Sequence, residues 1–502
     1  MLSTRSSQVA LWLAALTLLS ASLVRIVGVA SDQLVAPFDL VSEGPHMSAV
    51  KAIRAGVNIY DPASVFDLPL HVTPYTPLYH VLVALLPAQP GNPFFTGRVV
   101  ALVFMVGSAA GLFAVVRRRD YAPLAVLGVA LFFLIRAVTA NTAFLRCDSM
   151  ALFFSVWAVI AATRNRAGRN GVVLPALLCV AAIAAKQSYL AAGGACFLHF
   201  LQQGWRRAGA FLIAAAAFAA VLALAASIYW GNGFWTCIAL PITDYPRDME
   251  GFAVHWRQMV HEPVFLVILV AAAGLFVTAL DLAPVTLVWA SPYFHYLTLS
   301  LIAQSFALTG VGAWTHNLIE PVLAMLLWIA VASQELGGAM RLDWRRAAVL
   351  AVIAGCVALE LRSADRMEYS FTTMDQSAQY VFERARIARA MGALGLEHGR
   401  ILNLKSCQAA HDFDGEIVLN DPWMYYMVLL LTRPATAARL VKAIEERSFD
   451  AILVPANLVS AEQQPGDNPV QVVFRKAFTY YRIAIRGQRL NVLIPIGSKG
   501  TS

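Results

Sequence analysis

Charged residues are scarce in this sequence of 502 residues. Asp, Glu, Lys and Arg make up only 14% of the chain, hydrophobic residues make up 59%, and the mean hydropathy is +0.63. Because a soluble domain has roughly 25% charged residues, this chain has too few to cover several soluble domains. The composition therefore predicts that most of the chain lies in lipid.

Cysteine, glycine and proline are not abundant either, with 6, 31 and 23 residues. These counts exclude a disulfide scaffold, a collagen-like repeat and a low-complexity chain. The sequence has no CxxC pair, Gly-rich phosphate loop, H-E-x-x-H or G-x-S-x-G motif. An Asp-x-Asp pattern occurs at Asp412 and Asp414. We interpret it as a surface turn, because the surrounding region is too small for a nucleotide-binding domain.

Long apolar runs are what the sequence does have. A bilayer core of ~30 Å needs about 20 apolar helical residues. Eleven runs of roughly that kind are predicted to span the membrane: 8–29, 98–116, 121–137, 147–163, 171–185, 188–203, 208–229, 263–280, 283–303, 315–333 and 346–361. The run 75–88 has only 14 residues and contains two prolines, so we expect it not to span.

The distribution of arginines between the loops predicts the orientation of the chain in the membrane. Cytoplasmic loops are enriched in Lys and Arg. With eleven spans and an internal N-terminus, the loops predicted inside collect most of the clustered arginines: 117–119, 164, 166, 169, 206, 207, 341, 345 and 346. The net charge of +8 is therefore explained without nucleic acid. We expect an integral protein of the bacterial inner membrane, with loop 30–97 and the C-terminal part outside the cytoplasm.

The predicted fold is an all-α polytopic membrane protein with a small C-terminal α/β domain. Residues 1–361 form the transmembrane domain, and residues 362–502 form the extracytoplasmic domain. In the latter, short buried strands are predicted at 400–404, 416–420 and 450–455, and helices at 375–393 and 435–447.

Ionisable residues near the membrane are costly and mark functional sites. With this topology they gather at the extracytoplasmic helix ends: Asp39, Glu43, Arg146, Asp148, Lys186, His316, Asn317 and Glu320. A carboxylate there can accept a proton from a hydroxyl, and Lys or Arg can bind a phosphate. This combination favours displacement at a sugar carbon with a phosphate leaving group, the inverting form of glycosyl transfer.

Several segments resemble the GT-C glycosyltransferases, in particular the family 39-like branch of bacterial aminoarabinose transferases and protein O-mannosyltransferases. They are FDLVSEGPHMSAVKAIRAGVNIYDP (38–62), YTPLYHVLVALLP (75–87), LRCDSMALFF (145–154), AAKQSYL (184–190) and GAWTHNLIEPVLAMLL (312–327). The resemblance implies inverting transfer from a polyprenyl-phosphate sugar to a lipid, glycan or protein acceptor on the extracytoplasmic face.

The resemblance also implies a catalytic acid in the first outer loop. The family has an adjacent Asp-Glu pair, whereas here Asp39 lies four residues before Glu43. We favour Glu43 slightly as the base, with Asp39 as its partner, and Asp148 matches a recurrent acid of the second outer loop. The candidates for substrate binding are Lys51, Arg54, Tyr75, Arg146, Lys186, His316, Asn317 and Glu320.

Other functions remain as alternatives. A transporter or flippase for an anionic or lipid-linked substrate would also need a charged cavity, although such proteins often show two related halves and no repeat is evident here. A scaffold that binds a partner through the C-terminal domain is the third hypothesis. No cofactor is required by these residues, and the sequence leaves a divalent metal open.

Overall fold

The structure is a computed structural model of the chain. It describes residues 2–40, 43–116, 119–164, 169–282, 290–310, 313–336, 374–396, 398–404, 416–421, 424–463, 467–488 and 490–497. The predicted span 346–361, the arginines at 341–346, the boundary at 361–362 and the Asp-x-Asp pattern at 412–414 lie outside these residues.

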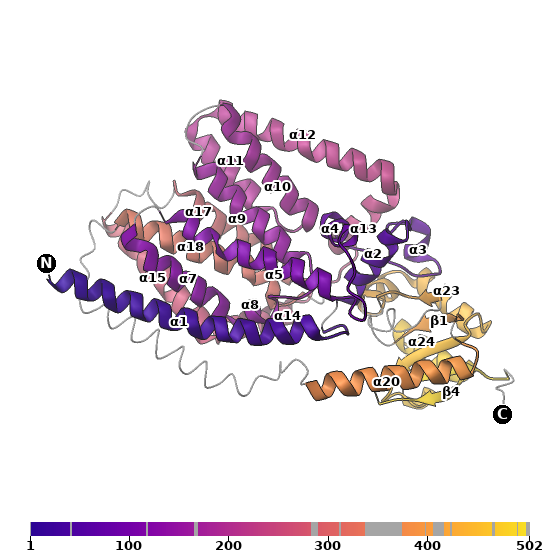
Figure 1. The fold of residues 1–502 in the computed structure, drawn as a ribbon. Coiled ribbons are helices and arrows are strands. Elements are labelled where there is room, and N and C mark those ends of the chain that lie inside the picture. The colour runs from indigo at the N-terminus through magenta and orange to yellow at the C-terminus, as the bar shows by residue number, and fades with distance from the viewer. Residues whose placement is uncertain are drawn as a thin grey trace.

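A bundle of helices forms the N-terminal part (Figure 1). The 34-residue helix α1 runs along one side of this bundle and packs against α7. The bundle contains α1 (Leu2–Val35), α5 (Phe95–Ala109), α6 (Gly111–Val115), α7 (Ala122–Leu134), α8 (Arg136–Ala140), α9 (Asp148–Arg164), α10 (Val173–Ala185), α11 (Ala191–Gln203), α12 (Trp205–Trp230), α15 (Pro263–Leu282), α17 (Pro292–Leu308) and α18 (Ile319–Leu336).

The apolar runs predicted from the sequence are helical along most of the length that the structure describes. Four of the described helical segments are long and apolar enough to cross a membrane, or up to five if a bent pair counts as one: Leu11–Val35, Phe95–Val115, Trp205–Trp230, Thr315–Leu336 and the pair Met249–Val260 with Pro263–Val277. The protein is therefore integral to the membrane, while the predicted number of eleven spans is not confirmed.

Helices α18 and α12 are both apolar but differ in how much of their surface is buried inside the protein. Helix α18 is apolar around its circumference and is buried along most of its length, as expected for a helix at the centre of a bundle. Helix α12 is equally apolar, but Ile213 and Ile228 expose 73% and 77% of their surface. These exposed side chains face the hydrocarbon when α12 lies at the outside of the bundle.

Short helices cover the end of the bundle opposite the N-terminus. They are α2 (Gly44–Arg54), α3 (Pro62–Phe66), α4 (Leu78–Leu85), α13 (Asn232–Thr243) and α14 (Met249–Val260). Helix α4 occupies the run 75–88, and its eight residues reach only about 12 Å at 1.5 Å per residue. It is too short to cross a bilayer.

The C-terminal part contains a mixed five-stranded sheet in the order β2-β1-β3-β5-β4. Strand β1 pairs in parallel with β2 and β3, which requires crossover connections between these strands. Strand β5 pairs antiparallel with β3 and β4. The elements are α20 (Met374–Ala393), β1 (Arg400–Asn403), β2 (Glu416–Val418), α22 (Leu430–Thr432), α23 (Pro434–Glu445), β3 (Ala451–Pro455), α24 (Pro469–Tyr480), β4 (Tyr481–Arg486) and β5 (Leu490–Pro495).

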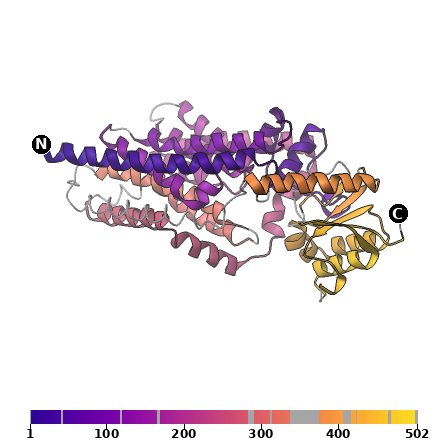
Figure 2. The same cartoon turned by 60° about the horizontal axis from the view of Figure 1, so that its bottom comes forward.

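The predicted strands and helices of this region are present, and the hairpin of β4 and β5 adds two strands that the sequence analysis did not predict. In both ribbon views this sheet lies beyond the end of the bundle that carries α2 and α3, far from the N-terminus (Figures 1 and 2). We call that end of the bundle the domain end.

The first loop and the C-terminal part share a hydrophobic core at the domain end. Buried Tyr60 and Val72 belong to the same apolar cluster as Val418 and Tyr425. The Asn420 amide also bonds both backbone groups of Val72, accepting from its N–H at 3.1 Å and donating to its carbonyl at 3.2 Å. The amide thus continues the loop backbone as a strand neighbour would, and it fixes the C-terminal part against the loop.

Candidate active site

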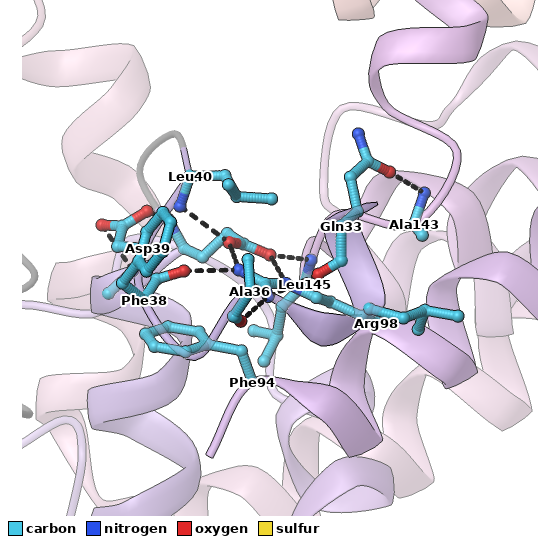
Figure 3. Close-up of polar contacts among 12 residues, drawn as sticks. Gln33, Ala36, Phe38, Asp39, Leu40, Phe94, Arg98, Ala143 and Leu145 are labelled. Atoms are coloured by element: carbon cyan, nitrogen blue, oxygen red, sulfur yellow. Dashed lines mark hydrogen bonds and ion pairs between the residues drawn. The ribbon is translucent and has the colours of Figure 1, made fainter. Parts of the chain in front are cut away.

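Glu43 and Arg98 form a buried ion pair at the domain end (Figure 3). Neither side chain exposes any surface. Arg98 Nε donates to Glu43 Oε1 at 2.9 Å, and its Nη2 donates to Oε2. The backbone N–H groups of Leu145 and Leu40 donate to the same two oxygens at 2.7 and 3.1 Å. Each carboxylate oxygen therefore accepts two hydrogen bonds.

The remaining donors of Arg98 bond the backbone after α1. Nη1 donates to the carbonyls of Gln33 and Ala36, and Nη2 donates to that of Phe38 at 2.7 Å. Since a guanidinium has five N–H donors, all of them are used. The pair joins the end of α1, the start of α2, α5 and the segment before α9. Glu43 has no lone pair left for a substrate, so its observed role is to hold these elements together.

Asp39 lies beside this pair but serves a different purpose. Its half-buried carboxylate accepts the backbone N–H groups of Glu43 at 2.8 Å and Gly44 at 3.1 Å, at the N-terminus of α2. Burial and the negative charge of Glu43 raise the pKa of Asp39 from 3.8 to about 6. Asp39 thus positions the first turn of α2, which carries Pro45 and His46.

A cavity of about 420 Å³ opens at the domain end. Its wall combines charged and titratable side chains with aromatic rings of the N-terminal part, and the C-terminal part contributes Asp421. The lining residues are Pro45, His46, Pro74, Tyr75, Arg146, Asp148, Tyr245, Asp248, Gly251, His255, Leu308, Gly310, Ala313, Trp314, His316 and Asp421. The volume is in the range of small-molecule sites.

Five predicted residues lie together at this cavity because they are at the ends of neighbouring helices. Arg146, Asp148 and His316 line its wall, and Lys186 joins Asp148 to Asn317. Arg146 and Asp148 precede and begin α9, Lys186 follows α10, and His316 and Asn317 lie in the single turn η3 (Thr315–Leu318) before α18. Lys186 Nζ donates to Asp148 Oδ1 at 2.5 Å and to Asn317 Oδ1 at 3.3 Å. Arg146 Nη1 lies 3.2 Å from His316 Nδ1.

The Arg146 contact determines the tautomer of His316. A guanidinium only donates hydrogen bonds, so His316 Nδ1 must accept and the ring proton is on Nε2. That nitrogen lies 3.9 Å from Asp148 Oδ1. Asp148 Oδ2 has no hydrogen-bond partner among the described residues, and Asp148 lines the cavity. It is therefore the predicted acid whose oxygen is available to a substrate.

Tyr75 also lines the cavity, and it stacks on His46 with ring centroids 4.8 Å apart. His46 Nδ1 is 2.9 Å from His80 Nε2 of α4, and the two rings are also stacked. His46 is 4% exposed and His80 is fully buried. The sequence analysis quoted both histidines within the family-like segments but assigned them no role.

Besides Glu43 and Asp39, three predicted residues lie neither on the cavity wall nor in the hydrogen bonds of Lys186. Arg54 is exposed and donates to the carbonyls of Val83 and Leu86 at the end of α4. Lys51 is exposed on α2. Glu320 is fully buried in the first turn of α18, where Tyr296 and Gln304 donate to its two oxygens at 3.1 and 2.6 Å.

The cavity also contains residues that the sequence analysis did not select: Tyr245, Asp248, His255, Trp314 and Asp421. Tyr245, Asp248 and His255 come from the segment between α12 and α15, and Trp314 directly precedes η3. Asp421 comes from the C-terminal part and has no local signal. Among the described residues, no group of three or more His, Cys, Asp and Glu side chains could share a metal ion.

No protein-family model and no curated sequence matches the chain. Solved structures do match it. ArnT from Cupriavidus metallidurans bound to undecaprenyl phosphate is 13% identical, with a TM-score of 0.57, and the match covers 96% of this chain and 98% of that one. The apo state of the same protein is 11% identical, with a TM-score of 0.59 and coverages of 95% and 97%.

The Archaeoglobus fulgidus oligosaccharyltransferase, tethered to an acceptor peptide with an NVT sequon, is 11% identical, with a TM-score of 0.51. This match covers 93% of this chain and 72% of that one. At these identities the likeness establishes the fold alone. The resemblance predicted from the short segments is therefore confirmed at that level: this chain has the fold of the GT-C glycosyltransferase superfamily.

Proposed function

We propose that this protein is an inverting glycosyltransferase that moves a sugar from a polyprenyl-phosphate donor to an acceptor hydroxyl. The observation that carries the proposal is the cavity at the domain end, where Arg146, Asp148 and His316 line the wall and Lys186 bonds Asp148. We place this end outside the cytoplasm, as the arginine distribution predicts.

Arg146 and Lys186 are the proposed ligands of the donor phosphate. The phosphate of a lipid-linked donor must bind close to the membrane, next to cationic side chains. Arg146 precedes α9 and Lys186 follows α10, so both cations lie at the ends of helices. Arg suits a bidentate contact and Lys a point contact. When the anomeric C–O bond breaks, these two charges stabilise the negative charge that develops on the departing phosphate.

Asp148 has a double role in this proposal. Through Oδ1 it holds Lys186 in place, and through the free Oδ2 it contacts a hydroxyl of the sugar or of the acceptor. Tyr75 contributes an aromatic ring to the cavity wall, which suits the apolar face of a sugar ring. Glu43 and Asp39 support the site indirectly, because they fix the start of α2.

A proteoliposome assay tests this function. The purified protein is mixed with labelled undecaprenyl-phosphate sugars (a hexose, a pentose and an aminopentose) and with lipid, glycan and peptide acceptors. The expected result is release of undecaprenyl phosphate together with a labelled glycoside. Movement of the intact donor between leaflets without bond cleavage would instead favour the flippase.

Two variants locate the phosphate site. Arg146→Gln and Lys186→Gln are each expected to weaken the binding of undecaprenyl phosphate and to lower transfer. Arg257→Gln is the matched control, because Arg257 is an exposed cation on α14 that does not line the cavity. Unchanged binding in both cavity variants would overturn the assignment of the phosphate ligands.

A further inference from the structure

The histidine pair His46 and His80 lies on the cavity wall, and the function proposed above leaves it without a role. His46 is the third residue of α2, whose start is fixed by the Asp39 and Glu43 contacts. His80 is in the first turns of α4. The 2.9 Å contact between His46 Nδ1 and His80 Nε2 requires one proton between the two nitrogens.

Burial keeps both rings neutral. It lowers the pKa of His46 well below its ordinary value, and it lowers the pKa of His80 to about 4. The other charged groups that act on His46 are Arg146 and Lys186, which lower its pKa, and Asp148, which raises it. Two neutral imidazoles can share a hydrogen bond only if one donates and the other accepts.

The surroundings of His80 favour one of the two arrangements. The backbone carbonyl of Thr76, one turn earlier, favours a proton on the His80 ring. His80 Nδ1 is buried and has no hydrogen-bond partner among the described residues. Because His80 Nε2 is engaged by His46, the proton that the Thr76 carbonyl favours belongs on Nδ1, and Nε2 then accepts. His46 consequently donates through Nδ1, and its Nε2 is an unprotonated nitrogen. No hydrogen bond to this nitrogen is found among the described residues, and it is not fully enclosed by protein.

We propose that His46 Nε2 is the general base that takes the proton from the acceptor hydroxyl, with His80 as the positioning residue that fixes its tautomer. This inference rests on the proposed glycosyl transfer and names its base. The geometry favours His46 over the carboxylates. Glu43 accepts four hydrogen bonds, and Asp39 is bound to the start of α2. Asp148 keeps Oδ2 for a substrate contact, but the Lys186 ammonium at Oδ1 stabilises its ionised form and so disfavours the uptake of a proton.

The step balances without a further reagent. The hydroxyl proton moves to His46 Nε2 while the hydroxyl oxygen forms its bond to the anomeric carbon. The bond from that carbon to the phosphate oxygen breaks, and its electron pair stays on the phosphate. His46 is then an imidazolium that shares its charge with His80 through the Nδ1 hydrogen bond, and it returns the proton to cavity water after the products leave.

Turnover and binding together test the base. His46→Gln is expected to lower transfer by about 10²-fold or more, in line with the ~10²–10⁴-fold contribution of a general base, while binding of undecaprenyl phosphate is unchanged. His46→Asn provides a second variant if the first is poorly folded. His295→Gln is the matched control, since His295 lies in α17 and bonds Gln202 away from the cavity.

The pH profile of transfer shows whether His46 or Asp148 is the base. It also shows whether His80 affects the titration of His46 or only supports the fold. Wild-type transfer is expected to fall as the pH drops through the lowered pKa of His46, because a protonated ring cannot accept a proton. His80→Phe should move this acidic limb while leaving undecaprenyl phosphate bound. Retention of the limb and of the rate in His46→Gln, or loss of the limb only in Asp148→Asn, would overturn the inference.

A measurement that does not depend on turnover examines the tautomers. In protein labelled with ¹⁵N-histidine, signals of His46 and His80 are assigned from the spectra of His46→Gln and His80→Gln. At neutral pH we expect an unprotonated Nε2 on His46 and a protonated Nδ1 on His80. A proton on His46 Nε2 would refute the base. Absence of transfer by the wild-type protein with every donor would refute the proposed function itself.

Discussion

The guanidinium of Arg98 and the carboxylate of Glu43 meet with neither side chain exposing any surface. The pair joins residues 55 positions apart in the sequence, at the point where the first loop leaves the membrane helices. Such a pair is costly to desolvate, and it is stable only because the other donors and acceptors of both side chains are satisfied.

Breaking this pair is therefore expected to destabilise the protein strongly. Glu43→Gln or Arg98→Met alone leaves a buried charge without its partner, at a cost of about 3–5 kcal/mol. The double variant should be less destabilised than the sum of the two single variants. Thermal melting in detergent measures this, with Arg475→Ala as the control, because its Asp467 partner is 96% exposed. Additive losses would show that the two residues act independently.

Asp39→Asn is expected to change the pH dependence of stability. Because the folded-state pKa of Asp39 is raised to about 6, the folded protein binds a proton between pH 4 and 6 that the unfolded chain has lost. This carboxyl group makes stability fall as the pH rises through that range. The melting temperature of Asp39→Asn relative to wild type should therefore rise between pH 4 and 6. A constant difference would show that the pKa is not raised.

Asn420→Ala should loosen the C-terminal part from the first loop. The substitution leaves the buried N–H and carbonyl of Val72 without their partners, and each unsatisfied group costs about 1–3 kcal/mol. We expect a lower melting temperature and faster proteolysis between the loop and the sheet. Wild-type protease resistance would contradict the proposed role of this amide.

Gly233→Ala should disturb the packing of α13 on the first loop. A Cβ at this position would lie 1.6 Å from the backbone oxygen of Tyr60, so the two segments would have to move apart. Overpacking of this kind costs about 1–3 kcal/mol. The control is Gly209→Ala in α12, where a Cβ meets nothing within 4 Å. That change should be neutral or stabilise the helix by about 0.5–1 kcal/mol.

The convergence of Arg146, Lys186 and His316 was predictable from the sequence because each lies at the end of a membrane helix, and helix ends on one side of a bilayer share one level. The partner of Glu43 was not predictable in this way. Arg98 lies in the first turn of α5, and only the tertiary contacts of its side chain decide that every oxygen lone pair of Glu43 is used.

The contact between the two histidines and the position of Asp421 at the cavity could not be predicted either, because both depend on long-range packing. His46 and His80 are separated by 34 residues, and they meet because two short helices pack together. Strands β4 and β5 pair into a hairpin whose alternation of exposed and buried residues is weak. Long-range contacts of this kind depend on the complete fold, whereas an apolar run can be recognised from its local sequence.

Asp421 reaches the cavity from the last third of the chain, whereas His46 reaches it from the first tenth. The cavity wall is thus completed only after residue 421 has left the ribosome. A shortened chain that ends before residue 416 would keep its membrane helices but would have a pocket open on one side. Such a chain is expected to insert normally and to bind its acceptor poorly.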